Sequence, residues 1–453
     1  MPFENEFASY EPLRRILENP KVKALQDRLK IRKREEIEKD FNERITHKEK
    51  IVPSDFQPDM VLAIDGSYQE VKVENGFPGA TIGYITVASV LLFMDKIREH
   101  SREEFIDPKK FRETEKAATI DTVFPGCNII LDTETSAKSS MRKTLFNELK
   151  TYSVFNGSET LLTTYEHLLK IKLDKGTGEK PPKCPHEDCD SEFKYDLGEY
   201  ECPKCKGKLY STDALRLHEL MNPVGSNGEL FGQIMSTLER LSLVHILRSF
   251  EKSNWIPTLR RVAFFLDGPL AVFSTSSWLT KPIIHELKRI NALTNEMYKQ
   301  DLVIIGIEKT GTFFNHFEEI DISIEGEKDI FPRQTALLLF DDYIKKNIIF
   351  SESTKTYGQD TYFGRKLFYK TLNGYRIVPS IAFYNDYQMN IRTANPDQFS
   401  RLADAMGLLD QLVSSRFPHS VIPLISAHAE AAIPLNLGKK IFEDIAKEIK
   451  ARN

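Results

Sequence analysis

The sequence predicts an α/β protein in which helices flank a β-sheet. Two short apolar runs, 60–64 and 262–266, are each followed by Asp-Gly, which is typical of buried strands that end in a polar turn. A third apolar run, 302–307, is also expected to be a buried strand. The segment 229–248 is apolar nearly all round and too long for a strand, so it predicts a buried helix.

Length and charge limit the class of protein. With 453 residues the chain exceeds one ordinary domain and should form two or three units. Sixty-two Lys and Arg against 66 Asp and Glu give a net charge of −4, which excludes a broadly basic surface but allows a local basic groove. Met1–Pro12 lacks the basic start and apolar core of a signal peptide, and no apolar run approaches the roughly 18 residues of a membrane span. We therefore expect a cytoplasmic protein with no membrane contact.

Changes in composition suggest where the parts of the chain begin and end. The start of the chain is highly charged, with apolar residues at the spacing of amphipathic helices, and Pro53 and Pro58 mark entry into the main domain. The expected parts are an N-terminal helical segment (1–57), the two parts of a core (58–175 and 216–438), an insertion between them (176–215) and a C-terminal helix (439–453).

Strands are expected to gather around the first Asp-Gly pair. Residues 80–93 are long, β-branched and largely apolar, which predicts a strand paired with the 60–64 run. A separate polar strand is expected at 69–73. One sheet can then bring Asp65 and Asp267 side by side at one edge, where paired carboxylates would bind a divalent metal ion.

The strand-then-acid pattern recurs once more before the insertion. Asn128–Leu131 is expected to be a strand, and Asp132 and Glu134 after it are either further metal ligands or helix caps. Helices are expected at about 139–151 and 158–171.

Four of the five cysteines lie in one short block within the insertion. They form two pairs with four and two intervening residues, and this spacing supplies the four thiolates of a tetrahedral zinc site. A closed shell of four thiolates leaves no position for water, so the zinc is expected to be structural. The ribbon either binds nucleic acid or protein, or only stabilises a loop. The four residues are Cys184, Cys189, Cys202 and Cys205.

Three further residues have both a chemical and a structural interpretation. Glu239 lies on the apolar helix 229–248, where a lone carboxylate is unfavourable, so either a metal ion or an arginine such as Arg240 should neutralise it. Lys309 follows the 302–307 strand and either contacts a phosphate or lies in a solvated loop. His428 lies among small residues and is either near a metal or substrate, or a buried structural histidine.

The segment 361–370 interleaves aromatic and basic residues. This composition suits stacking on bases and contact with phosphate, for which Tyr362, Arg365 and Lys366 are the expected nucleic-acid ligands. It equally suits an amphipathic strand whose aromatic face belongs to the core.

Five motifs in this order resemble the NurA nucleases of DNA end processing. They are Ala63–Ser67, Met235–Glu239, Phe265–Leu270, Gly306–Lys309 and Pro423–His428. The resemblance implies a ribonuclease H-like mixed sheet on which Asp65, Glu239, Asp267 and His428 gather around catalytic Mn(II) or Mg(II), with Lys309 bracing the phosphate. Family members usually have a tyrosine shortly before the histidine, where this chain has Ser420 and Val421.

The resemblance also implies an activity and partners. It implies a metal-dependent exonuclease on single-stranded and duplex DNA ends with single-strand endonuclease activity, a homodimer, and a HerA-type hexameric ATPase as partner. Two alternatives stay open. One is a catalytically weak zinc-ribbon scaffold that binds DNA or the ATPase, and the other is an actin-like-fold phosphotransferase, although Asp65 and Gly66 are adjacent here and that class has a residue between them.

Overall fold

The computed structural model describes residues 10–30, 44–51, 56–73, 77–95, 97, 115–153, 159–176, 181–322, 329–414 and 419–432. The chain forms two compact units, Met1–Lys39 and Asp40–Asn453. The expected C-terminal helix at 439–453 lies outside the described residues. None of the helices among those residues is long and apolar enough to cross a membrane.

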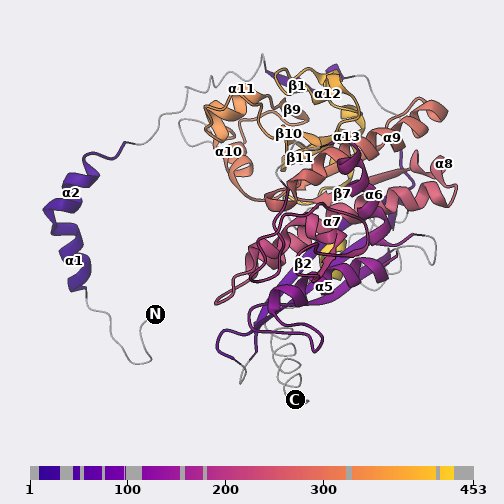
Figure 1. Cartoon of the computed structure of the whole chain (residues 1–453). Helices are drawn as coiled ribbons and strands as arrows, with labels where there is room; N and C mark the ends of the chain where they lie inside the picture. The colour runs from indigo at the N-terminus through magenta and orange to yellow at the C-terminus, as the bar shows by residue number, and fades with distance from the viewer. Residues whose placement is uncertain are drawn as a thin grey trace. The chain divides into compact units, whose positions relative to one another are not determined.

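The first unit contains the two short helices α1 (Glu11–Glu18) and α2 (Pro20–Gln26), shown at the indigo end of the chain in Figure 1. Pro20 is the first residue of α2, and the side chain of Asn19 accepts a hydrogen bond of 2.9 Å from the backbone N–H of Lys21. No residue of either helix is buried within the unit. Both helices lie within the segment 1–57 that was expected to be helical.

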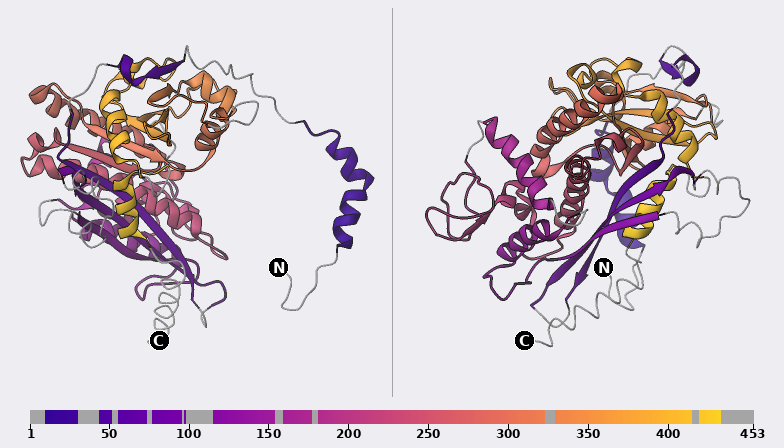
Figure 2. Two further views of the ribbon diagram at one scale, coloured as in Figure 1. Left: turned by 180° about the vertical axis from the view of Figure 1, so that it is seen from behind. Right: turned by 90° about the vertical axis from the view of Figure 1, so that its right-hand side faces the viewer.

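The second unit is built on a mixed sheet with the strand order β1-β9-β10-β11-β8-β7-β2-β3-β4 (Figures 1 and 2). Strands β2, β7 and β8 run parallel, and the other neighbours pair antiparallel. The part β4-β3-β2-β7-β8 is the ribonuclease H-like arrangement that the motifs imply. The strands are β1 (Ile45–His47), β2 (Met60–Lys72), β3 (Thr81–Phe93), β4 (Glu115–Pro125), β7 (Val262–Asp267), β8 (Val303–Glu308), β9 (Thr335–Leu338), β10 (Gly364–Lys370) and β11 (Arg376–Ala382).

Helices cover both faces of the sheet, as the right-hand view of Figure 2 shows. Leu62 and Ile64 of β2 belong to the core under α5, α6, α7 and α9, whereas Val61 and Ala63 belong to the core under α13 and α14. This alternation follows from the two-residue period of a strand. The helices are α5 (Ala137–Thr151), α6 (Leu161–Asp174), α7 (Gly228–Lys252), α8 (Ile256–Leu259), α9 (Thr280–Tyr298), α10 (Thr312–Ile320), α11 (Asp341–Tyr343), α12 (Asp386–Met389), α13 (Leu402–Leu412) and α14 (Ile422–Ala431).

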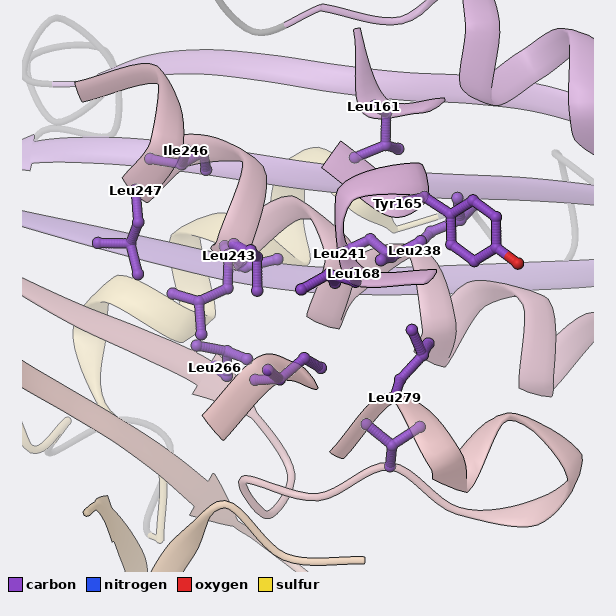
Figure 3. Packing of buried hydrophobic residues seen from close by; sticks show 14 of the residues in the cluster. Leu161, Tyr165, Leu168, Leu238, Leu241, Leu243, Ile246, Leu247, Leu266 and Leu279 are labelled. Carbon is purple, nitrogen blue, oxygen red and sulfur yellow. The ribbon is translucent and has the colours of Figure 1, made fainter. Parts of the chain in front are cut away.

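Helix α7 is the central helix of the first core, as its apolar sequence predicts. Seventeen of its residues are buried, and its leucines pack against α6, β7 and the turn before α9. Figure 3 shows this packing for Leu161, Tyr165, Leu168, Leu238, Leu241, Leu243, Ile246, Leu247, Leu266 and Leu279.

Glycines let α7 approach the sheet closely. A Cβ atom on Gly83 of β3 would lie 2.4–2.6 Å from ring atoms of Phe231, and one on Gly66 of β2 would lie 2.7 Å from Cγ of Met235. Real Cβ atoms do not approach neighbours this closely. The helix therefore packs on the backbone of β2 and β3 at both places.

Three expected features of the sheet are wrong. Asn128–Leu131 is not a strand, because Asn128 has a φ of 57° and turns the chain away from the sheet edge. The strand at this edge is β4, whose alternation of exposed and buried residues at 119–124 marks a half-buried edge strand. The polar residues 69–73 are not a separate strand, because β2 continues through them to Lys72. Residues 45–47, expected in the N-terminal segment, form β1 and pair with β9.

We predict that Gly83→Ala destabilises the protein by about 1–3 kcal/mol, because the added methyl group overpacks the contact with Phe231. Gly407→Ala is the matched control. Gly407 lies in α13 with open space around its Cα, so alanine should stabilise the helix by about 0.5–1 kcal/mol. Urea unfolding followed by circular dichroism measures both effects. A Gly83→Ala midpoint equal to that of the wild type would contradict the close packing of α7.

We also predict a pH dependence from His245 of α7, which is fully buried and forms a 2.8 Å hydrogen bond between Nδ1 and Oγ1 of Thr164. Burial lowers its pKa to about 4, and Arg248 lowers it further whereas Glu159 opposes the shift. The unfolded chain takes up a proton near pH 6.5 and the folded chain does not, so stability falls by about 2 kcal/mol between pH 7 and pH 5. In His245→Gln this loss should be absent, and in His47→Gln it should persist. Equal pH profiles of the free energy of unfolding in all three proteins would refute the assignment.

Candidate functional site

Three of the four predicted metal ligands, Asp65, Asp267 and His428, line one open pocket with a volume of about 630 Å³, together with Lys309, the residue predicted to brace the phosphate. The fourth predicted ligand, Glu239, is not among the lining residues. The pocket lies where the parallel pairing of the strands β2, β7 and β8 ends, beside the start of α10. Its lining combines acidic, basic and aromatic side chains. The other lining residues are Gly66, Gly268, Pro269, Phe273, Glu308, Thr310, Thr312, Phe313, Ile349, Tyr357, Tyr362 and Lys366.

The register of the parallel strands places the two aspartates together. Ile64 pairs with Leu266, so Asp65 and Asp267 are the next residues on neighbouring strands. β7 ends at Asp267, whereas β2 continues with β3 as its partner. Asp65 therefore lies inside a strand and not at its end, at the point where β2 loses its parallel neighbour. Its side chain is only 2% exposed.

Glu239 reaches the same place from α7. Its Oε1 would lie 2.9 Å from a Cβ atom on Gly66, so the absence of a side chain there admits the carboxylate. Burial raises the pKa of Glu239 to about 8, with Asp65 and Asp267 adding to the shift and Arg240 opposing it. Glu239 forms an ion pair with Arg240, the partner considered as an alternative to metal.

Arg240 also holds the backbone of the loop after Asp267. Its Nη2 donates to the carbonyl oxygens of Asp267 at 3.3 Å and Pro269 at 3.2 Å, and its Nε donates to that of Ala271 at 3.2 Å. The arginine thus joins the helical carboxylate to the second Asp-Gly turn.

Lys309 lies between the two aspartates. Its Nζ is 2.5 Å from Oδ1 of Asp267 and 4.0 Å from Oδ2 of Asp65. The ammonium group therefore pairs with the buried Oδ1 of Asp267 and also approaches Asp65. Burial and Asp65 raise the pKa of Asp267, and Lys309 lowers it. The lysine therefore faces the carboxylates and is not a freely solvated loop residue.

His428 comes from α14, which packs on β2 and β3. Its Nδ1 lies 3.2 Å from Oδ2 of Asp65, and this hydrogen bond raises the pKa of the imidazole. Its side chain is 61% exposed, so the alternative of a buried structural histidine is wrong.

These residues fit a divalent cation by their chemistry. Asp65, Asp267 and Glu239 supply the hard oxygen donors that Mg(II) and Mn(II) prefer. The ammonium group of Lys309 already brings positive charge to the two aspartates. The ligand atoms are spread more widely than those of the cysteine cluster, which is the one group of three or more His, Cys, Asp or Glu among the described residues that lies within 4.8 Å.

The predicted nucleic-acid ligands divide between the pocket and the core. Lys366 lines the pocket, where its Nζ is 2.6 Å from Oε2 of Glu308 and 3.5 Å from the ring centre of Phe313. Burial lowers the pKa of Lys366, and Glu308 opposes this shift. Tyr362 also lines the pocket. Arg365 is 2% exposed and donates to backbone carbonyl oxygens of residues 388, 390 and 393, so this geometry favours a structural role.

Sequence reasoning did not single out four of the pocket residues. Glu308 directly precedes Lys309 at the end of β8, and Phe273 lies a few residues after Asp267, so their positions near strand ends were a usable signal. Phe313 on α10 and Tyr357 in a loop come from segments with no such signal.

The predicted zinc ligands meet in a ribbon around the hairpin of β5 (Glu199–Glu201) and β6 (Lys208–Tyr210). The sulfur atoms of Cys184 and Cys205, and those of Cys189 and Cys202, are 3.8 Å apart. A zinc ion with four bonds of about 2.3 Å requires tetrahedral edges of about 3.8 Å, so the cluster can bind zinc.

His186 connects the ribbon to α5. Its Nδ1 is 3.1 Å from Sγ of Cys184, and its Nε2 is 3.4 Å from Nη1 of Arg142. Arg142 in turn donates two hydrogen bonds to the Asp213 carboxylate, at 2.7 and 2.6 Å. Glu134, considered as a metal ligand, forms an ion pair with Lys143 instead, and Asp132 is exposed.

Comparison with known proteins gives one family. The model of the family described as "NurA domain" matches residues 59–433. Among solved structures, the NurA nuclease from Sulfolobus solfataricus aligns over 98% of this chain and 97% of its own, with 12% identity and a TM-score of 0.32. A second NurA crystal structure aligns over 98% and 99%, with 10% identity and a TM-score of 0.31. A search of curated proteins found no match.

We predict about one tightly bound zinc ion per chain, lost in Cys202→Ser because three thiolates and a hydroxyl no longer form the four-sulfur shell. Cys127→Ser is the matched control. The Cys127 thiol contacts the carbonyl oxygen of Pro223 at 2.7 Å and lies outside the cluster, so this variant should keep its zinc. Elemental analysis of chelator-free protein measures the metal. Wild-type protein without zinc, or zinc retained in Cys202→Ser, would refute the site.

Proposed function

The chain belongs to the NurA family, and from this premise we propose that it is a divalent-metal-dependent deoxyribonuclease whose active site is the pocket around Asp65 and Asp267. The observation that carries the proposal is the convergence of residues from β2, α7, β7, β8 and α14 on this one pocket. Two aspartates, a lysine and a histidine line this pocket from positions up to 363 residues apart in sequence. The buried Glu239 approaches the pocket residue Gly66 from α7.

In this proposal, Asp65, Asp267 and Glu239 would hold Mn(II) or Mg(II), with His428 as a further ligand or proton carrier. Held by these residues, the ion would supply Lewis acidity toward a water molecule and positive charge opposite the phosphodiester. Lys309 reaches the pocket from β8 and can move its ammonium group from Asp267 to a phosphate oxygen. His428 keeps Nδ1 on Asp65, which leaves Nε2 to exchange a proton with water or the leaving 3′ oxygen.

We propose that Arg240 is a positioning residue, which acts by holding Glu239 and the turn after Asp267 in place. It neutralises Glu239 and fixes the carbonyl groups of the Asp267–Pro269 turn, so it keeps the second aspartate in position. Lys366 and Tyr362 also line the pocket, and we propose that they contact the DNA strand.

Family membership supports three further proposals. We infer that the substrate is DNA at single-stranded and duplex ends, with exonuclease and single-strand endonuclease activity, that the protein acts as a homodimer, and that a HerA-type hexameric ATPase is its partner. Mass measurement in solution and copurification with such an ATPase address the last two. The zinc ribbon at 176–215 is proposed as a structural insertion between the two parts of the core.

We predict that Asp65→Asn and Asp267→Asn each lower the Mn-dependent cleavage of single-stranded DNA by at least about 100-fold, because each removes a charged ligand while keeping the side-chain volume. Asp132→Asn should retain wild-type activity, since Asp132 is exposed and does not line the pocket. The assay compares single-stranded DNA, duplex DNA and RNA with Mn, Mg or EDTA.

Two outcomes would overturn the assignment. One is full activity in both aspartate variants, and the other is cleavage by the wild type that EDTA does not abolish. Binding of DNA by the wild type without cleavage in any metal would favour the scaffold alternative.

A further inference from the structure

We propose that the aromatic side of this pocket is a stacking site for an unpaired nucleobase, with Phe273 as the platform. The inference deepens the proposed function and rests on it, because it places the base of a substrate nucleotide beside the metal-binding carboxylates. It names a residue and a ligand group that the nuclease chemistry itself does not require.

Phe273 is held in place relative to Asp267. The segment 270–272 follows the Asp267 turn and runs beside residues 361–363, where the N–H of Val272 donates to the carbonyl of Thr361 at 2.9 Å and that of Phe363 donates to Leu270 at 2.8 Å. Backbone hydrogen bonds on both strands of this pairing restrict the segment. The ring therefore sits at a defined position in the same pocket as the carboxylate.

Phe273 is the most exposed ring of an aromatic group in which Tyr357 and Tyr362 are half-buried and Phe313 is buried. Its exposure is 39%, whereas Phe313 is 2% exposed. The ring of Tyr362 lies 5.7 Å from that of Phe273 in an edge-to-face arrangement, and the ring of Tyr357 lies 5.4 Å from Tyr362. The rings of Tyr357, Tyr362 and Phe273 thus lie in a row, and Phe273 is the ring at the solvent-exposed end.

The support behind Phe273 is rigid. The hydroxyl groups of Tyr357 and Tyr362 are 3.0 Å apart, and Lys366 lies 4.9 Å from the ring centre of Tyr362. A Cβ atom on Gly358, which has a φ of 69°, would lie 2.3 Å from Cδ2 of Tyr362, so the glycine backbone packs directly on that ring. These contacts restrict the Tyr362 ring, so a base that stacks on Phe273 would meet a preformed surface.

The chemistry selects an unpaired base. A flat exposed ring offers a π-face that every base can cover, and such stacking contributes a factor of about 5 to 150 in affinity per base. A base inside a duplex already has both faces stacked, so the ring can serve a single strand or a frayed end. A pocket of about 630 Å³ is in the range that holds a ligand the size of a nucleotide.

The test measures binding of a single-stranded DNA oligonucleotide with a terminal 2-aminopurine, whose fluorescence is quenched by stacking, to full-length protein in EDTA. Phe273→Leu keeps an apolar side chain without the ring, and Phe273→Trp keeps a ring. Phe77→Leu is the control, because Phe77 is 75% exposed and does not line the pocket. A second oligonucleotide with an abasic terminal position, and an RNA strand of the same sequence, complete the set.

We expect wild type, Phe273→Trp and Phe77→Leu to quench the probe and to bind the abasic strand about tenfold more weakly than the normal one. Phe273→Leu should bind the normal strand about tenfold more weakly than wild type and should not distinguish the two strands. Quenching by the RNA strand would extend the site to both nucleic acids. Equal discrimination against the abasic strand in wild type and Phe273→Leu overturns the proposal, as does a wild type without quenching.

This experiment separates the two proposals. Stacking in EDTA without metal-dependent cleavage would remove the nuclease assignment and keep the base site. Normal cleavage with no dependence of binding on the terminal base would remove the base site and keep the nuclease.

Discussion

The close packing of α7 on the backbone of β2 determines the whole site. Gly66 lies between Asp65 and Ser67 and has no side chain, so Met235 and Glu239 can rest on the strand itself. The same helix carries Arg240, which holds the turn after Asp267. One helix–strand contact therefore fixes a glutamate, an arginine and, through the arginine, the second aspartate.

The charges in the pocket are balanced almost completely by the protein. The ammonium of Lys309 approaches both aspartates, Arg240 pairs with Glu239, and His428 hydrogen-bonds to Asp65. Three carboxylates so close together would otherwise repel one another strongly in a poorly solvated place. The arrangement explains how the fold can bury acidic groups for chemistry without a permanently bound ion.

The sequence predicts the site residues best where the residue period of a strand or helix, or the end of a strand, determines which side chains meet. The Asp-Gly runs were sufficient to predict that Asp65 and Asp267 lie side by side, because neighbouring strands that end in the same motif bring their ends together. The apolar helix showed only that Glu239 is buried and needs a partner, and the family resemblance was needed to place it near the aspartates. Sequence patterns did not reveal the strand β4, because its half-polar alternation resembles a surface segment. They also wrongly predicted a strand at Asn128–Leu131, where the apolar residues follow a turn. Arg365 and Lys366 are adjacent and equally basic, but only the register of β10 decides that Lys366 faces the pocket and Arg365 the loop at 388–393. The position of Phe273 in the pocket depends on the pairing of residues 270–272 with residues 361–363, and no local sequence pattern reveals this pairing.

The two proposed metal sites would differ in how tightly they are linked to folding. The four sulfur atoms of the ribbon surround a space of zinc dimensions, and a small hairpin of this size gains much of its folding free energy from the ion. The pocket, in contrast, has its own cations in Lys309 and Arg240. If the pocket binds the proposed catalytic ion, the protein would stay folded while that ion exchanges with the surroundings, so the supply of Mn and Mg, and not the history of folding, would determine which ion is present at each turnover.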